Sequence, residues 1–165
     1  MTRLITMLCA ALLLTGCGFT PMYGTDAENS SVTQAMAAID IEEIPDRLGK
    51  QVHNNLLDAI TPGGMPGSAQ YRLQVQLLEE REDVGLRQDA SVTRANYRLR
   101  AQFRLIDNND EAVLIHGSTW AETAFDVTSS DYSTLIAERA AQERLARDVA
   151  LEIRNQLALY FGREE

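Results

Sequence analysis

Four arginines in one short stretch are the residues best suited to chemistry in this chain. Arg94, Arg98, Arg100 and Arg104 all occupy even positions, so a regular β-strand would place them on one face, because successive side chains point to opposite sides. A guanidinium carries a planar fork of donors that matches phosphate or carboxylate oxygens. We therefore expect this arginine row to bind an anionic ligand or an acidic partner. The alternative is an ordinary solvated face on which arginine serves solubility.

Enzymatic chemistry finds little support in the rest of the chain. The two histidines, His53 and His116, are expected in a helix and in a strand, each as a surface or packed side chain. No GxSxG, GxGxxG or P-loop pattern occurs. The adjacent carboxylates Glu79 and Glu80 would point to opposite faces of a strand. We expect no catalytic residue, no metal site and no cofactor.

The N-terminus has the order of an export signal. A charged start containing Arg3 precedes an apolar run over residues 4–14, and small residues then lead to Cys17. The run is well short of the ~20 residues needed to cross a bilayer. Residues 14–17, Leu-Thr-Gly-Cys, resemble the lipobox of bacterial lipoproteins. We expect cleavage after the signal peptide, residues 1–16, and lipidation of Cys17, so that acyl chains hold the protein at a membrane.

Cysteine content, length and charge limit which disulfides, domains and partners can be expected for the rest of the chain. Cys9 would leave with the signal peptide and Cys17 would be acylated, so no disulfide is expected. Residues 17–35 are polar and lack an apolar period, which predicts a lipidated tether. Residues 36–165 then suit a single α/β domain with one core. The chain has 15 Lys and Arg against 24 Asp and Glu, for a net charge of −9, which argues against a nucleic-acid partner.

Alternation of apolar and polar residues predicts the strands. It runs over residues 71–77 and, most clearly, over 95–105, where the arginine row occupies the polar positions. A polar connection is expected between these two strands. A first strand is predicted over 36–44, and turn-forming residues at 107–110 predict a hairpin to a fourth strand over about 112–125.

Two helices should cover this sheet. Residues 46–60 place apolar side chains at every fourth position, which predicts an amphipathic helix, and residues 133–161 contain no Pro or Gly and carry one apolar stripe. The strands alternate rather than being apolar throughout, so the helices must lie on one sheet face. We predict an α+β two-layer sandwich, in the order β-α-β-β-β-α, with two helices on one face of a four-stranded mixed sheet. The other face is expected to be polar and open.

Residues 17–24, Cys-Gly-Phe-Thr-Pro-Met-Tyr-Gly, resemble the start of the LptE lipopolysaccharide-assembly lipoproteins, in particular the alphaproteobacterial type with its CGF-x-P-x-YG pattern. Beyond this segment the likeness is one of layout. The resemblance implies a lipoprotein of the outer membrane that is not an enzyme. Such a protein would plug the β-barrel that delivers lipopolysaccharide to the cell surface and would help that barrel assemble.

The resemblance also implies partners and a place. The partners would be the outer-membrane lipopolysaccharide-assembly β-barrel, lipopolysaccharide itself, and the membrane through the lipid anchor. The protein would lie on the periplasmic side of the outer membrane or inside the barrel lumen. Arg94, Arg98, Arg100 and Arg104 are the nearest match to the basic residues through which the family binds lipopolysaccharide, although they could instead pair with acidic residues of the lumen, whose interior is typically polar.

A second class of function stays open. A lipoprotein accessory subunit of an ABC-type lipid transporter in the periplasm would share the anchor and the small α/β domain. Co-purification separates the two, because a large β-barrel should accompany the protein in the first case and an inner-membrane ATPase complex in the second.

Overall fold

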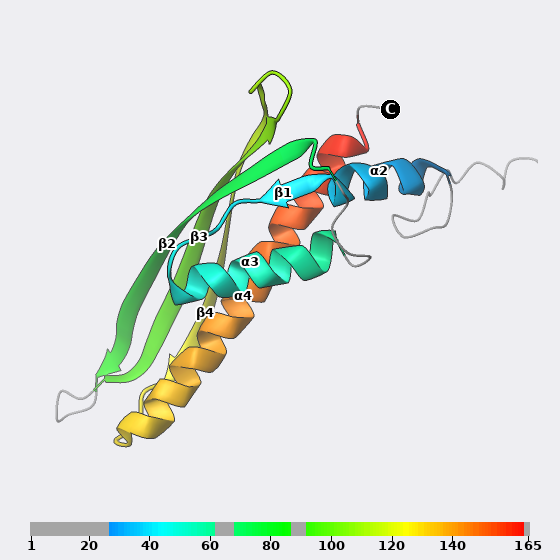
Figure 1. The fold of residues 1–165 in the computed structure, drawn as a ribbon. Helices are drawn as coiled ribbons and strands as arrows, with labels where there is room; N and C mark the ends of the chain where they lie inside the picture. The colour runs from blue at the N-terminus through cyan, green and yellow to red at the C-terminus, as the bar shows by residue number, and fades with distance from the viewer. Residues whose placement is uncertain (1–26, 62–67, 87–91, 164–165) are drawn as a thin grey trace, which may run out of the picture. The chain divides into compact units, whose positions relative to one another are not determined.

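The computed structural model describes residues 27–61, 68–86 and 92–163. The predicted signal peptide and Cys17 lie outside these residues. The chain divides into two compact units, residues 1–30 and residues 31–165, and the second holds the sheet and the helices that cover it (Figure 1). In chain order the elements are α2 (Ala27–Ala37), β1 (Ile39–Ile41), α3 (Asp46–Ile60), β2 (Tyr71–Leu86), β3 (Val92–Asp107), β4 (Val113–Asp126) and α4 (Asp131–Phe161).

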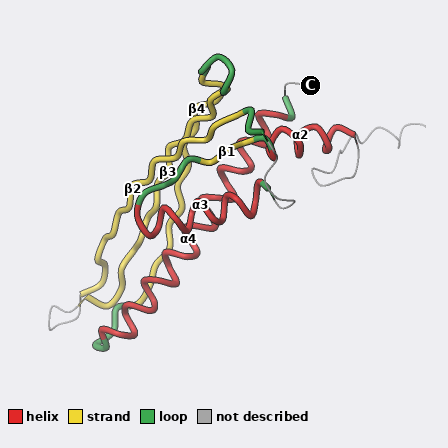
Figure 2. Tube along the Cα trace, viewed as in Figure 1, coloured by secondary structure: helices red, strands yellow, loops and turns green. Residues whose placement is uncertain are grey.

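The four strands form one mixed sheet in the order β1-β2-β3-β4. β1 runs parallel to β2, whereas β2, β3 and β4 pair antiparallel with their neighbours. A parallel pair needs a crossover connection, and α3 supplies it. Helices α3 and α4 pack together on one side of the strands (Figure 2). The predicted fold, a two-layer α+β sandwich on a four-stranded mixed sheet, is confirmed.

Apolar spacing explains the two covering helices. In α3, which has the predicted bounds of 46–60, the buried side chains recur every four residues at Leu48, Val52, Leu56 and Ile60. In α4 the Ser130 side chain caps the N-terminus by accepting from the backbone N–H of Ser133. Among the described residues no helix is both long and apolar enough to span a membrane.

Strand β3 forms the centre of the core. Its odd-numbered side chains from Ala95 to Leu105 face the helices, and none is more than 5% exposed. The strand alternates as predicted, because one face packs under α3 and α4 while the other meets solvent. The hairpin from β3 to β4 is also confirmed, with a turn at residues 108–110.

The structure corrects three expectations about the elements. A helix, α2, occupies Ala27–Ala37, where a tether without regular structure was predicted, and Met36 at its end is buried in the core. The first strand spans Ile39–Ile41 rather than residues 36–44. The second strand continues to Leu86, so the charged residues 81–83 belong to it and not to a polar connection.

Candidate functional site

The candidate site is the open face of the sheet, by which we mean the face opposite α3 and α4. The even-numbered residues of β3 lie on it, and they include all four members of the arginine row. The register places carboxylates of the neighbouring strands beside them, since Arg98 lies between Glu80 and Glu122. The predicted placement of the row on one face is therefore correct, but the row is not a bare cationic strip.

Arg98 is the most firmly held member of the row. Its Nε and Nη2 donate to Glu122 Oε2 at 2.8 and 2.5 Å, and its Nη1 lies 3.7 Å from Glu80 Oε2. Its guanidinium carbon also lies 5.5 Å from the centroid of the Trp120 ring, within range of a cation–π interaction. The hydrogen bond to Glu122 raises the pKa of Arg98. This side chain is thus fixed in place while 40% of it stays exposed.

Arg100 lies at the centre of an unexpectedly apolar part of the open face. Its register partners are Leu78 on β2 and Trp120 on β4, which are 57% and 63% exposed. Its Nη2 lies 3.4 Å from Glu80 Oε2. A shallow hollow of about 430 Å³ opens here, between Arg98, Arg100 and Trp120. The expectation of a wholly polar open face is wrong at this point.

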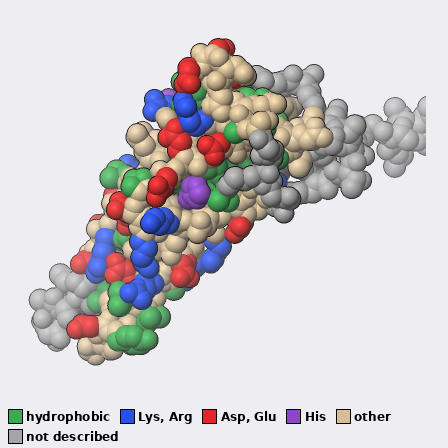
Figure 3. All heavy atoms as spheres, viewed as in Figure 1, with side chains coloured by type: hydrophobic (Ala, Val, Ile, Leu, Met, Phe, Trp, Pro, Cys, Tyr) green, Lys and Arg blue, Asp and Glu red, His purple; other side chains and the backbone are tan. Residues whose placement is uncertain are grey.

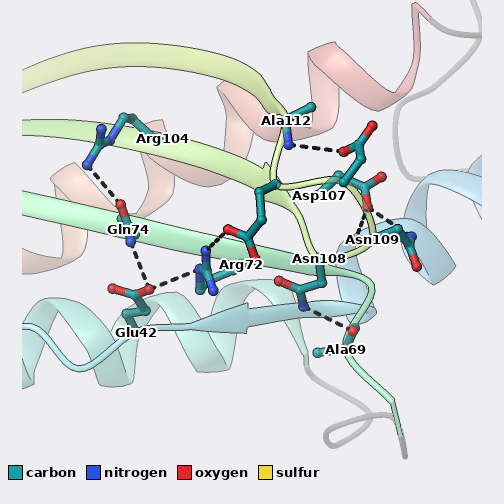
Figure 4. A network of polar contacts seen from close by, with 11 residues as sticks. Glu42, Ala69, Arg72, Gln74, Arg104, Asp107, Asn108, Asn109 and Ala112 are labelled. Carbon is teal, nitrogen blue, oxygen red and sulfur yellow. Dashed lines mark hydrogen bonds and ion pairs between the residues drawn. The ribbon is translucent and has the colours of Figure 1, made fainter.

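Arg104 belongs to a polar network near the turn between β3 and β4 (Figure 4). Its Nη2 donates to Gln74 Oε1 at 2.9 Å, and Gln74 Nε2 donates to Glu42 Oε1 at 2.9 Å. Arg72 forms two ion pairs in this network. Its Nε lies 3.1 Å from Glu42 Oε1, and its Nη2 lies 2.6 Å from Glu111 Oε2. The network links the residue after β1 to the turn that leads into β4, and Arg104 joins it through its hydrogen bond to Gln74 on β2.

Arg94 lies at the other end of the row, opposite Asp126 in the register. Basic and acidic side chains also interleave on the side of the molecule that Figure 3 presents, which has α3 and α4 toward the viewer. A ligand that approaches the arginine row must therefore compete with carboxylates that already contact it. The row suits an anion that carries several charges, or a partner surface with its own complementary pairs.

A second polar chain lies on the helix side of the sheet, where it is only partly buried. The Tyr97 hydroxyl donates to Glu79 and accepts from Gln142 Nε2 at 3.0 Å, and Arg47 donates to the Gln142 side chain. Burial, followed by the hydrogen bond to Glu79, raises the pKa of Tyr97 to about 12. This chain ties both helices to β2 and β3 and faces away from the open face.

The histidines take places that do not suggest acid–base work. His53 on α3 lies with its Nε2 3.2 Å from the carbonyl oxygen of Ile41. His116 is exposed on β4, opposite Arg104 in the register. Within the described ranges, no three His, Cys, Asp or Glu side chains are grouped so that they could hold a metal ion.

Comparison with known families decides which family this fold represents. The family profile described as "LptE: Lipopolysaccharide-assembly" matches residues 32–157, which include every strand and most of α4. The chain belongs to the LptE family. The resemblance noted in residues 17–24 is thus confirmed by an independent and much longer segment. LptE is a non-catalytic family of lipopolysaccharide assembly.

One similar sequence shares the length of this LptE-family chain, and two solved structures share its fold. An uncharacterized protein of Rickettsia prowazekii (strain Madrid E) is 25% identical over 160 residues, which cover 97% of each chain. A candidate lipoprotein from Caulobacter crescentus CB15 has a similar structure, with a TM-score of 0.67 and 21% identity over 80% of this chain and 96% of that one. Lipoprotein B of Nitrosomonas europaea, with a TM-score of 0.55 and 14% identity over 74% and 81% of the two chains, has the same fold.

Proposed function

We propose that this LptE-family protein is an outer-membrane lipoprotein that forms a complex with the lipopolysaccharide-transport β-barrel. It acts as the plug and assembly partner of that barrel and assists delivery of lipopolysaccharide to the cell surface. The observation that carries the proposal is the family match over residues 32–157. The proposed role is recognition and not catalysis.

The open face supports a plug role. Its charges are already paired with one another, as in the contacts of Arg98 with Glu80 and Glu122. Paired, hydrated side chains suit the lumen of a large barrel, which is polar and water-filled. The opposite face is closed by the protein's own helices, so the sheet needs no partner to complete its core.

The attachment to the membrane is proposed to run through Cys17. Cleavage after residue 16 would leave this thiol at the N-terminus, and the several acyl chains of a lipoprotein would hold it firmly, since a single chain anchors only marginally. The domain would then stay beside the bilayer in which the barrel is inserted.

The complex is tested by capture of the full-length, tagged protein from detergent-solubilised native membranes. We expect a large outer-membrane β-barrel to travel with it in a one-to-one complex. Cys17→Ala removes the lipidation site and should sharply reduce the amount of complex. Recovery of an inner-membrane ATPase complex in place of the barrel would refute the proposal and would support the transporter-accessory alternative.

The arginine row is proposed to contact either the phosphates of lipopolysaccharide or acidic groups of the barrel lumen. The double charge reversal of Arg98 and Arg100 to Glu should weaken binding of lipopolysaccharide or barrel on the order of tenfold or more, because two charge-assisted contacts are lost. The matched control reverses Arg144 and Arg147, which are exposed on α4. If the folded double variant binds both partners as the control does, the row has no part in either contact.

A further inference from the structure

The two edges of the sheet are protected very differently. On the β2 side, β1 pairs with Tyr71–Leu73, and the rest of the strand carries five consecutive charged residues at positions 79–83. Among these, Arg81 points toward the helix layer, where it lies 3.1 Å from Asp83 and 3.7 Å from Glu138. Charged side chains on the inner side of an edge strand discourage another strand from pairing there. The β2 edge is therefore protected against pairing with a further strand.

The β4 edge has no comparable protection. β4 is the last strand in the sheet order, and among the described residues none pairs with its outer side. The strand has 14 residues, contains no proline, and has no Asp, Glu, Lys or Arg from Val113 to Ala121. Val113 and Trp120 are 53% and 63% exposed. Long, uncharged edges of this kind are rare in soluble proteins unless something covers them, because they are templates for further pairing.

The chemistry of this edge determines what can cover it. An edge strand presents backbone N–H and C=O groups at the regular spacing of the sheet, and the one structure that offers complementary groups at the same spacing is another extended backbone. Helix α4 satisfies the edge to a small extent, through Gln156 Nε2, which lies 3.3 Å from the carbonyl oxygen of Ser118. Among the residues that the structure describes, no strand pairs with the outer side of β4.

We propose that the edge of β4 accepts an extended strand of a partner protein, which continues the sheet beyond β4. The occupant is uncharged beside Val113–Ala121 and carries a basic residue near Glu122 and Asp126, the two acidic residues of β4. A second copy of this chain fits poorly, since its own β4 contains no Lys or Arg and each chain has a net charge of −9. The inference rests on the proposed function in one respect, because the barrel partner would supply the strand.

Strand addition has a signature that other kinds of docking lack. In an antiparallel pair, backbone N–H groups point alternately toward the neighbouring strand and away from it. Hydrogen exchange at single-residue resolution should therefore show every second amide of residues 114–124 exchanging rapidly in the isolated, full-length protein. In the complex captured from native membranes these amides should slow, each on the order of tenfold. Amides of β2 beyond Leu77 serve as the internal control and should not change.

The outcomes separate this inference from the proposed function. If the barrel co-purifies and the β4 amides are unchanged, the edge proposal is overturned and the barrel complex stands. If another protein is captured instead and the alternate amides slow, strand addition stands and the barrel complex falls. Slow exchange, already in the isolated protein, of the β4 amides that point away from β3 would overturn the edge proposal, because a second copy or the chain's own residues would then cover the strand, and the measured mass distinguishes these two.

A matched pair of variants tests the edge by another route. Ser118 on β4 and Gln76 on β2 are the register partners of Gln102, and both are exposed on the open face. Ser118→Lys places a positive charge on the unprotected β4 edge and should reduce capture of the partner several-fold. Gln76→Lys makes the same change in charge on the protected β2 edge and should leave capture of the partner unchanged. Equal capture of the partner by both variants would contradict the proposal.

Discussion

The two faces of strand β3 alternate residue by residue and yet have opposite properties. On the inner face, Leu99 and Phe103 are no more than 1% exposed and lie in the core cluster. On the open face, Arg98 and Arg100 keep 40% and 51% of their side chains exposed, although both contact carboxylates. The difference places the apolar core on one face, and the proposed function assigns recognition to the other. Substitutions one position apart should therefore separate the two properties.

The largest effect is expected from the core. Phe103→Ala removes a fully buried ring and should lower the free energy of unfolding by about 3–5 kcal/mol, since the transfer free energy of the ring is lost and a cavity is left in its place. The matched control, Gln102→Ala, changes the adjacent exposed residue and should cost within about 0.5 kcal/mol. Urea denaturation followed by circular dichroism measures both. Comparable losses for the two variants would mean that the faces do not differ as described.

A smaller loss is expected where β4 approaches the same ring. A Cβ added at Gly117 would lie 2.3 Å from Phe103 Cζ and 2.6 Å from Cε1, so Gly117→Ala should destabilise the fold by about 1–3 kcal/mol through overpacking. Combining it with Phe103→Leu should cost less than the sum of the single variants, because the smaller side chain removes the clash. Strict additivity in the denaturation data would show that the ring is not what excludes the Cβ.

The polar chain through Tyr97 gives a prediction that depends on pH. The pKa of Tyr97 is raised in the folded protein to about 12, from an ordinary value of 10.0, first by burial and then by Glu79. The folded state thus holds this proton more tightly, so the corresponding stability is complete below pH 10 and is lost as the pH rises toward 12. Tyr97→Phe should cost about 1 kcal/mol at neutral pH and should show a shallower loss between pH 10 and 12. Parallel pH profiles of unfolding for the two proteins would contradict this assignment.

The smallest effect on stability is expected on the open face. The ion pair of Arg98 with Glu122 is exposed, and solvent screening leaves such pairs with little net effect on stability. A double-mutant cycle with Arg98→Ala and Glu122→Ala should give a coupling energy close to zero, while either single variant should weaken partner binding. A coupling of several kcal/mol would place a major part of the fold's stability on the open face and would remove the distinction between the two faces.

The sequence predicted the elements in which one physical signal dominates. The spacing of Leu48, Val52 and Leu56 marks α3 because each of these side chains meets the core, and the alternation of β3 is regular because its two faces meet helices and solvent. Helix α2 was missed because residues 27–37 show almost no segregation of apolar and polar positions. The extension of β2 was missed because Glu79, Arg81 and Asp83 occupy inner-face positions beyond the apolar core, where charge interrupts the expected alternation.

The candidate site was predicted in part. The even residue numbers of the four arginines were sufficient to place the row on one face, since the direction of a side chain depends only on its position along its own strand. The carboxylates and Trp120 that surround it come from other strands, and their positions depend on a register that local patterns do not specify. Counting back from the hairpin turn at 107–110 would pair Arg100 with Thr119, because a register shift between Leu105 and Ile106 is what brings Trp120 opposite Arg100. The open edge of β4 could not be inferred, since it follows from the order of the strands.

Helix α4 follows every strand in the chain and contributes nine buried side chains to the core. During synthesis the three-stranded meander of β2, β3 and β4 is therefore complete before its apolar side can be covered. In that interval the nascent protein exposes both an apolar surface and an unpaired strand edge, and both features promote aggregation. Protection of the sheet from aggregation therefore depends on residues as late in the chain as Leu157 and Phe161.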